Sequence, residues 1–153
     1  MKKFLALIFV LLICSSAFAA GSGVSEPAFA QQKNLGKDRL GLQWWLTEYG
    51  VGGAGYYAVA REYFTNGGAK SEIANNLKRY GVPSERAEAI YFAEFRFEYT
   101  SDGKQYAELS RVFYDMLGEE ICSYRTGHVV FNPITPNSVQ AKGVAYATGR
   151  IRD

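Results

Sequence analysis

The chain has very few residues of the kinds that build disulfides, metal sites or histidine-based catalysis. Its 153 residues include two cysteines, Cys14 and Cys122, and one histidine, His128. Cys14 lies in a segment that we expect to be removed, so a single thiol remains and an internal disulfide is excluded. Zinc sites take several His, Cys or carboxylate ligands. The sequence therefore predicts no metal and no cofactor, and a fold that is stabilised by packing.

The chain also lacks an excess of charge and an apolar run long enough to span a bilayer. It has 17 basic and 15 acidic residues, and removal of Lys2 and Lys3 leaves 15 of each. Such a balance gives no attraction to nucleic acid. The apolar run FLALIFVLLI covers ten residues, whereas a membrane-spanning helix needs roughly twenty. We therefore expect no retained transmembrane helix.

The N-terminal segment has the features of a secretory signal peptide. Lys2 and Lys3 precede the apolar run, and Ala17-Phe18-Ala19 fits the small-x-small cleavage pattern. Cleavage after Ala19 gives a periplasmic or extracellular chain of 134 residues, that is 153 minus 19. Lipoprotein anchoring through Cys14 is not favoured, because Ile13 stands where a small residue is needed. The predicted organisation is a signal peptide at 1–19, a flexible leader at 20–37 and a single α+β domain at 38–153.

Helical spacing recurs in the first half of this domain. Apolar residues lie at i, i+3, i+4 and i+7 from Leu42 to Tyr49 and again from Tyr56 to Phe64, which predicts two helices. In the first, Trp45 faces the core and Trp44 is partly exposed. A third helix is expected over about 70–80, ended by Gly81 and Pro83, and a short helical turn at 85–89.

A β-hairpin is predicted over 89–115, turning at Asp102-Gly103. Phe95, Phe97 and Tyr99 alternate with charged residues, as expected for a half-buried strand. Two registers are possible. A three-residue loop sets Phe97 against Ala107, whereas the alternative sets Phe97 against Glu108, and we favour the first. Further strands are expected at 120–126, 128–131 and 139–151, with Gly143 and Gly149 marking a bulge or a close backbone approach.

These elements predict an α+β fold. N-terminal helices at about 38–90 pack on a C-terminal antiparallel meander at about 90–152. In outline this order resembles the cystatin-like and NTF2-like cones, although no sequence motif accompanies the likeness and no family is identified.

Two patterns resemble cofactor-binding or catalytic motifs, and neither is complete. The glycines from Gly50 to Gly55 satisfy G-x-G-x-x-G, but the dinucleotide motif needs a preceding strand, and a helix is expected there. Cys122 and His128 could meet on adjacent strands as a nucleophilic pair, and no G-x-S-x-G motif is present. We therefore predict no catalytic residue.

Four acids on the hairpin could form a carboxylate pair of the glycosidase kind: Glu94, Glu98, Glu108 and Asp115. We interpret Glu94, Glu98 and Glu108, together with Arg96, as the solvated side of the hairpin.

Aromatic residues are abundant, with 11 Tyr and 10 Phe, and they are too many to be buried with satisfied hydroxyls. The candidate binding residues are Trp44, Tyr91, Tyr99, Tyr106, Tyr114 and Tyr124. They favour a small exported, non-catalytic binding protein that holds a protein partner or a small apolar ligand on an aromatic sheet face or in a helix–sheet cleft, as an inhibitor or immunity protein does. The alternatives are a small hydrolase or isomerase with a pocket in a curved-sheet cone, and a structural envelope protein. The oligomeric state stays open.

Overall fold

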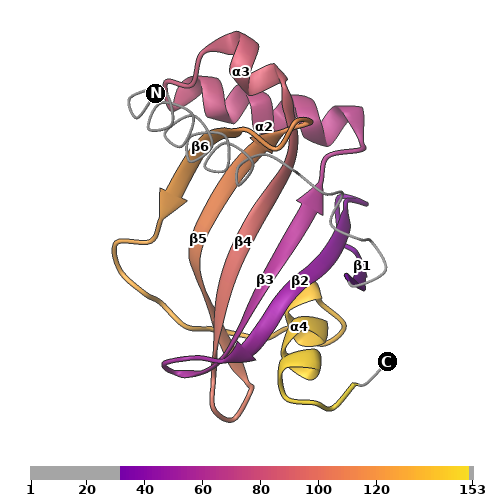
Figure 1. Cartoon of the computed structure of the whole chain (residues 1–153), viewed down its shortest axis with the longest axis vertical. Coiled ribbons are helices and arrows are strands. Elements are labelled where there is room, and N and C mark those ends of the chain that lie inside the picture. The colour runs from indigo at the N-terminus through magenta and orange to yellow at the C-terminus, as the bar shows by residue number, and fades with distance from the viewer. Residues whose placement is uncertain (1–31, 152–153) are drawn as a thin grey trace, which may run out of the picture.

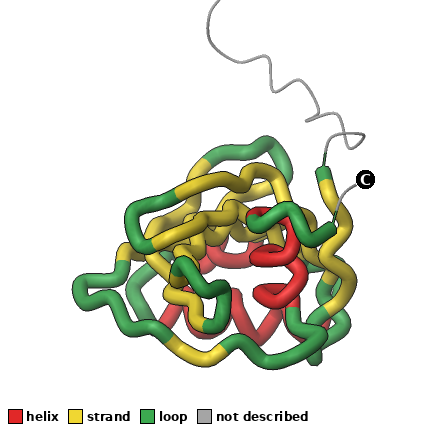
Figure 2. The backbone as a smooth tube through the Cα atoms, turned by 90° about the horizontal axis from the view of Figure 1, so that it is seen from below, coloured by secondary structure: helices red, strands yellow, loops and turns green. Residues whose placement is uncertain are grey.

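A curled antiparallel sheet is the main feature of the computed structural model, which describes residues 32–151 (Figure 1). Its six main strands follow one another in chain order from β1 to β6, and the two-residue strand β7 pairs with the first two residues of β5, Gln105 and Tyr106. Seen from below, the helices lie within the curl of the strands (Figure 2). The predicted signal peptide at 1–19 lies outside the described residues.

The first half of the domain is sheet, so the two helices predicted at 42–49 and 56–64 are wrong. The structure has β1 at Lys33–Lys37, β2 at Gln43–Val51 and β3 at Gly55–Tyr63. β1 also lies inside the predicted flexible leader at 20–37. The turn between β2 and β3 is the glycine-rich stretch, and a Cβ on Gly55 would lie 2.5 Å from the Ser101 backbone nitrogen. The glycines therefore serve a tight hairpin rather than a linker between helices.

β2 was predicted as a helix because its apolar residues fit both the helical spacing and the alternation of a strand. Leu42, Trp44 and Leu46 alternate and are all buried, whereas Trp45 and Tyr49 complete a helical spacing by coincidence. A bulge between Leu46 and Glu48 breaks the alternation further along the strand. Trp44 is consequently a core residue, 6 % exposed, and the predicted order of burial of the two tryptophans is wrong.

The two central helices match the prediction. α2 spans Gly67–Arg79, where the Asn66 side chain caps the start and Lys78 and Arg79 stand in the last turn. α3 spans Ser84–Glu88 and follows directly on Pro83. No described helix combines the length and the apolar character that crossing a membrane requires.

The hairpin is confirmed as β4 at Ile90–Thr100 and β5 at Gln105–Asp115. Phe95, Phe97 and Tyr99 share the buried face of β4, as predicted. The favoured register is wrong, because Phe97 pairs with Glu108. Four residues form the loop, because β4 ends at Thr100 and β5 begins at Gln105. The Thr100 hydroxyl accepts a hydrogen bond from the Gln105 backbone nitrogen across this loop. The unfavourable pairing is tolerated because Arg111 neutralises Glu108.

The C-terminal part contains one confirmed strand and one unexpected helix. β6 covers Glu120–Arg125 and β7 covers Asn132–Pro133, so the strand predicted at 128–131 is wrong. The strand predicted at 139–151 is wrong as well, because α4 spans Val139–Ala147. Its start is fixed by Ser138, whose hydroxyl accepts a hydrogen bond from the Ala141 backbone nitrogen at 3.1 Å.

The core lies between the concave side of the sheet, here called the inner face, and the helices. α4 packs on β1, β2 and β3, and α2 reaches β4. The predicted order of helices before sheet is therefore replaced by strands, two helices, four strands and a last helix. The inner face is carried by a set of buried side chains: Trp44, Leu46, Ala58, Ala60, Phe95, Phe97, Tyr99 and Phe113.

Candidate functional site

A cleft of about 570 Å³ opens between the turn that joins β1 to β2 and the start of α4. Lys37, Asp38, Arg39 and Trp44 form one wall, and residues 135–140 form the other. Trp44 reaches the cleft because it points inward from β2, and α4 lies opposite because it packs on β1 and β2. The volume lies in the range of small-molecule sites, about 300–1,000 Å³.

Asp38 organises the β1–β2 wall of this cleft. Its carboxylate accepts hydrogen bonds from the Leu40 backbone nitrogen at 2.8 Å, the Leu42 backbone nitrogen at 3.0 Å and the Trp44 indole Nε1 at 3.2 Å. Burial alone would raise the pKa of Asp38, but these hydrogen bonds and one from Glu62 together hold that pKa below its ordinary value. Asp38 is therefore an ionised structural group.

Glu62 is the buried partner of Asp38. It lies on the inner face of β3, paired in register with Trp44, and is 7 % exposed. Burial, followed by the hydrogen bond to Asp38 and its negative charge, raises the pKa of Glu62 to about 8, against a weaker opposite effect of Arg111. At neutral pH Glu62 is therefore protonated and donates to Asp38, so that the two carboxyl groups share one proton.

Arg111 and Glu108 extend these polar groups across the inner face. The guanidinium Nε and Nη2 of Arg111 contact the two carboxylate oxygens of Glu108 at 3.0 and 2.9 Å. The same guanidinium lies 4.5 Å from the ring centre of Phe95. Glu108 was predicted on the solvated side of the hairpin with Arg96, and this is wrong because the register places it opposite Phe97.

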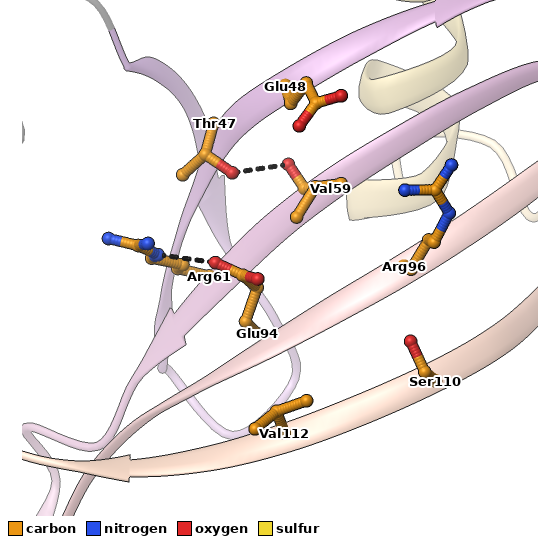
Figure 3. A pocket seen from close by; sticks show the side chains of 8 residues that line it. All are labelled: Thr47, Glu48, Val59, Arg61, Glu94, Arg96, Ser110 and Val112. Atoms are coloured by element: carbon orange, nitrogen blue, oxygen red, sulfur yellow. Dashed lines mark hydrogen bonds and ion pairs between the residues drawn. The ribbon is translucent and has the colours of Figure 1, made fainter. Parts of the chain in front are cut away.

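The convex side of the sheet, here called the outer face, carries a second hollow of about 400 Å³ (Figure 3). Arg61 and Glu94 form an ion pair at 2.9 Å within it. Glu48 accepts a hydrogen bond from Tyr57 at 2.6 Å, and Arg96 lies 4.8 Å from the centre of that ring. Each of these acids has a partner, as expected of a charged, hydrated sheet surface rather than of a catalytic pair.

An aromatic group lies on the outer face beside this hollow. The Phe92 ring stacks on Tyr114 with centres 4.8 Å apart, and it also contacts Tyr63 and Tyr91 at 5.5 and 6.4 Å. Arg61 lies 5.0 Å above the same ring. The structure therefore brings together two of the predicted binding residues, Tyr91 and Tyr114.

The other predicted binding residues do not join them. Tyr99 is 1 % exposed in the core, and Tyr106 is half-buried on the inner face beside Phe97 at 5.9 Å. Tyr124 is 59 % exposed on β6. Of the six candidates, Trp44 alone lines the cleft.

Among residues 32–151 the structure assembles neither a Cys122–His128 nucleophilic pair nor a metal site. Cys122 is half-buried, and that burial raises the pKa of its thiol, which disfavours the nucleophilic thiolate. His128 is exposed in the loop after β6, and no hydrogen bond joins the two. Asp115 accepts hydrogen bonds from the backbone of Leu117 and Glu119, which makes it a turn residue. In this part of the chain no three potential metal ligands are grouped.

Sequence reasoning missed Asp38, Glu62 and Arg111. A signal was present for Glu62, which interrupts the alternating apolar positions Ala58, Ala60 and Phe64 once the segment is read as a strand. Comparisons with protein-family models, with curated proteins and with solved structures found no match.

Proposed function

We propose that this chain is a small exported binding protein without catalytic activity, which holds a small ligand in the cleft between the β1–β2 turn and α4. The observation that carries the proposal is the position of Trp44, a buried aromatic residue at a cleft of about 570 Å³. The fixed hydrogen bond of its indole to Asp38 supports a pre-formed wall. The signal-peptide pattern at 1–19 supports export. Mass spectrometry of the exported protein tests this, because its mass should lack residues 1–19.

The shared proton of Asp38 and Glu62 resembles the carboxyl pairs of some hydrolases. However, Glu62 is not one of the cleft-lining residues, and the oxygens of Asp38 are occupied by structural donors. A substrate in the cleft would not reach the proton. The pair therefore supports the position of the β1–β2 turn rather than acid–base chemistry.

Filling the cleft tests the proposal. Thr135 lies on the α4 side of the cleft and is exposed, so Thr135→Trp adds a large side chain where a ligand would lie and leaves the core intact. We expect this variant to lose binding of the neutral dye phenylnaphthylamine by at least about tenfold, measured by dye fluorescence. Ser123→Trp, on the exposed part of β6, is the matched control and should bind as the unchanged protein does. Equal dye binding by both variants would contradict the proposal.

A further inference from the structure

On the wall of the cleft the acidic side chain has hydrogen-bond partners, whereas the two basic side chains form no ion pair within residues 32–151. Asp38 is the acidic residue of the lining, and its two oxygens already accept hydrogen bonds from the Leu40 and Leu42 backbone, the Trp44 indole and the Glu62 carboxyl group. Lys37 and Arg39, on either side of it, are exposed and form no ion pair among the described residues. A ligand therefore meets two available cations and one carboxylate that is already occupied.

A third cation lies beside this wall. Lys142, in the first turns of α4, places its Nζ against Gly36 in β1, where a Cβ would come within 2.8 Å. No acid stands in the first turn of α4, and residues 135–140 carry no charge. The local field at the cleft is therefore positive although the mature chain as a whole is balanced.

We infer that the cleft binds a small organic anion, a carboxylate, phosphate ester or sulfonate with an apolar body, whose acidic group lies between Lys37 and Arg39. The inference rests on the proposed function and names its ligand class. Arginine and lysine form charge-assisted hydrogen bonds with such groups. The apolar body would lie toward Trp44, Pro136 and Val139, which line the same cleft.

The alternatives are less compatible with these contacts. A cationic ligand would need a carboxylate that is free to pair with it, and the oxygens of Asp38 are already occupied by hydrogen-bond donors. A purely apolar ligand would leave Lys37 and Arg39 without a role and would gain nothing from their position. An anion with an apolar body uses both parts of the wall.

The test compares two dyes with the same aromatic body on the purified protein. Anilinonaphthalene sulfonate carries the acidic group, and phenylnaphthylamine lacks it. We expect the sulfonate dye to bind at least about tenfold more tightly, with an affinity that falls as salt is added. The double variant Lys37→Gln/Arg39→Gln should remove that advantage and leave the neutral dye unaffected. Arg79→Gln/Arg125→Gln removes two exposed charges elsewhere and should change neither affinity.

The outcomes separate the inference from the proposed function. The anion inference fails and the binding cleft stands if Thr135→Trp removes both dyes while one of two results is found. Either the two dyes bind the unchanged protein equally well, or Lys37→Gln/Arg39→Gln leaves the sulfonate dye tightly bound. If Thr135→Trp leaves both dyes bound, or neither dye binds the unchanged protein, both fail. Thermal unfolding of each variant is the check that the fold is kept.

Discussion

The free energy of unfolding should fall as the pH rises from about 5 to about 9, and Glu62→Gln should remove most of this dependence. Glu62 has its pKa raised from 4.5 to about 8 in the folded chain. A group with a raised folded pKa contributes stability that is fully present below the unfolded pKa and is lost as the pH passes through the folded pKa. With about 1.4 kcal/mol per pKa unit, the loss is on the order of 5 kcal/mol.

The amide of Glu62→Gln can donate the same hydrogen bond to Asp38 without titrating. We expect the variant to have about the stability of the unchanged protein at pH 5 and to be more stable by several kcal/mol at pH 9. Asp38 acts in the opposite sense, since its lowered pKa contributes stability that is lost only as the pH falls below about 4. Urea unfolding at a series of pH values measures both effects.

Glu94→Gln is the matched control for this experiment. Glu94 is an outer-face acid paired with Arg61, so its replacement should change the free energy of unfolding by less than about 1 kcal/mol. The fall in stability that Glu62 causes at high pH should persist in this variant. Parallel pH curves for Glu62→Gln and the unchanged protein would contradict the account of the shared proton.

The second large effect concerns the contact between α4 and the sheet. Gly143 is buried, and a Cβ at this position would lie 2.6 Å from the Tyr99 hydroxyl oxygen. Because Tyr99 is 1 % exposed, its ring has little room to move. We expect Gly143→Ala to lower the free energy of unfolding by about 1–3 kcal/mol, although alanine is the better helix former by about 1 kcal/mol.

A double-mutant cycle identifies the cause. Tyr99→Phe removes the oxygen that the added methyl group would meet, so Gly143→Ala should cost less than about 1 kcal/mol in that background. Gly67→Ala, at a helical glycine with no neighbouring atom within 4 Å, should not destabilise the protein by more than a few tenths of a kcal/mol. The same cost of Gly143→Ala with and without the Tyr99 hydroxyl would show that the contact is not the reason.

Local signals predicted the middle of the chain and failed at its ends. α2 ends before Gly81 and Pro83, whose effects act within a few residues, and β4 alternates between apolar and polar residues from Ala93 to Thr100. In β2, by contrast, adjacent tryptophans and a bulge allow two periods, and only pairing with β1 and β3 decides between them. Gly143 lies in α4 and Gly149 lies just beyond its end. In the sequence both indicate a strand bulge or a close backbone approach, and the structure shows that Tyr99 fills the space beside Gly143.

The hairpin register shows a further limit of sequence reasoning. Pairing Phe97 with Glu108 looks unfavourable between two strands alone. A bulge beyond Glu108 places Arg111 on the same face, where it neutralises the acid and covers Phe95. Such compensation depends on a third residue and cannot be read from the alternation of either strand.

The candidate site was predictable only in part, for the same reason. Trp44 was identified as a binding residue on the basis of a helix that does not form, and its place in the cleft depends on the strand that does. Lys37 was assigned to a flexible leader. Asp38 and Glu62 are 24 positions apart in the sequence, and they meet only because β2 and β3 pair. Contacts of this kind arise from topology and not from local pattern.

Both proposals require that a ligand occupies the cleft beside Trp44. The most direct measurement is the indole N–H resonance of Trp44 in a ¹⁵N spectrum, recorded while anilinonaphthalene sulfonate is added. The Trp44 Nε1 proton is held by Asp38 at the wall of the cleft, so its resonance should shift progressively, together with the backbone signals of residues 135–140. Shifts confined to Tyr91, Phe92 and Tyr114 on the outer face, with the Trp44 indole unchanged, would contradict the account.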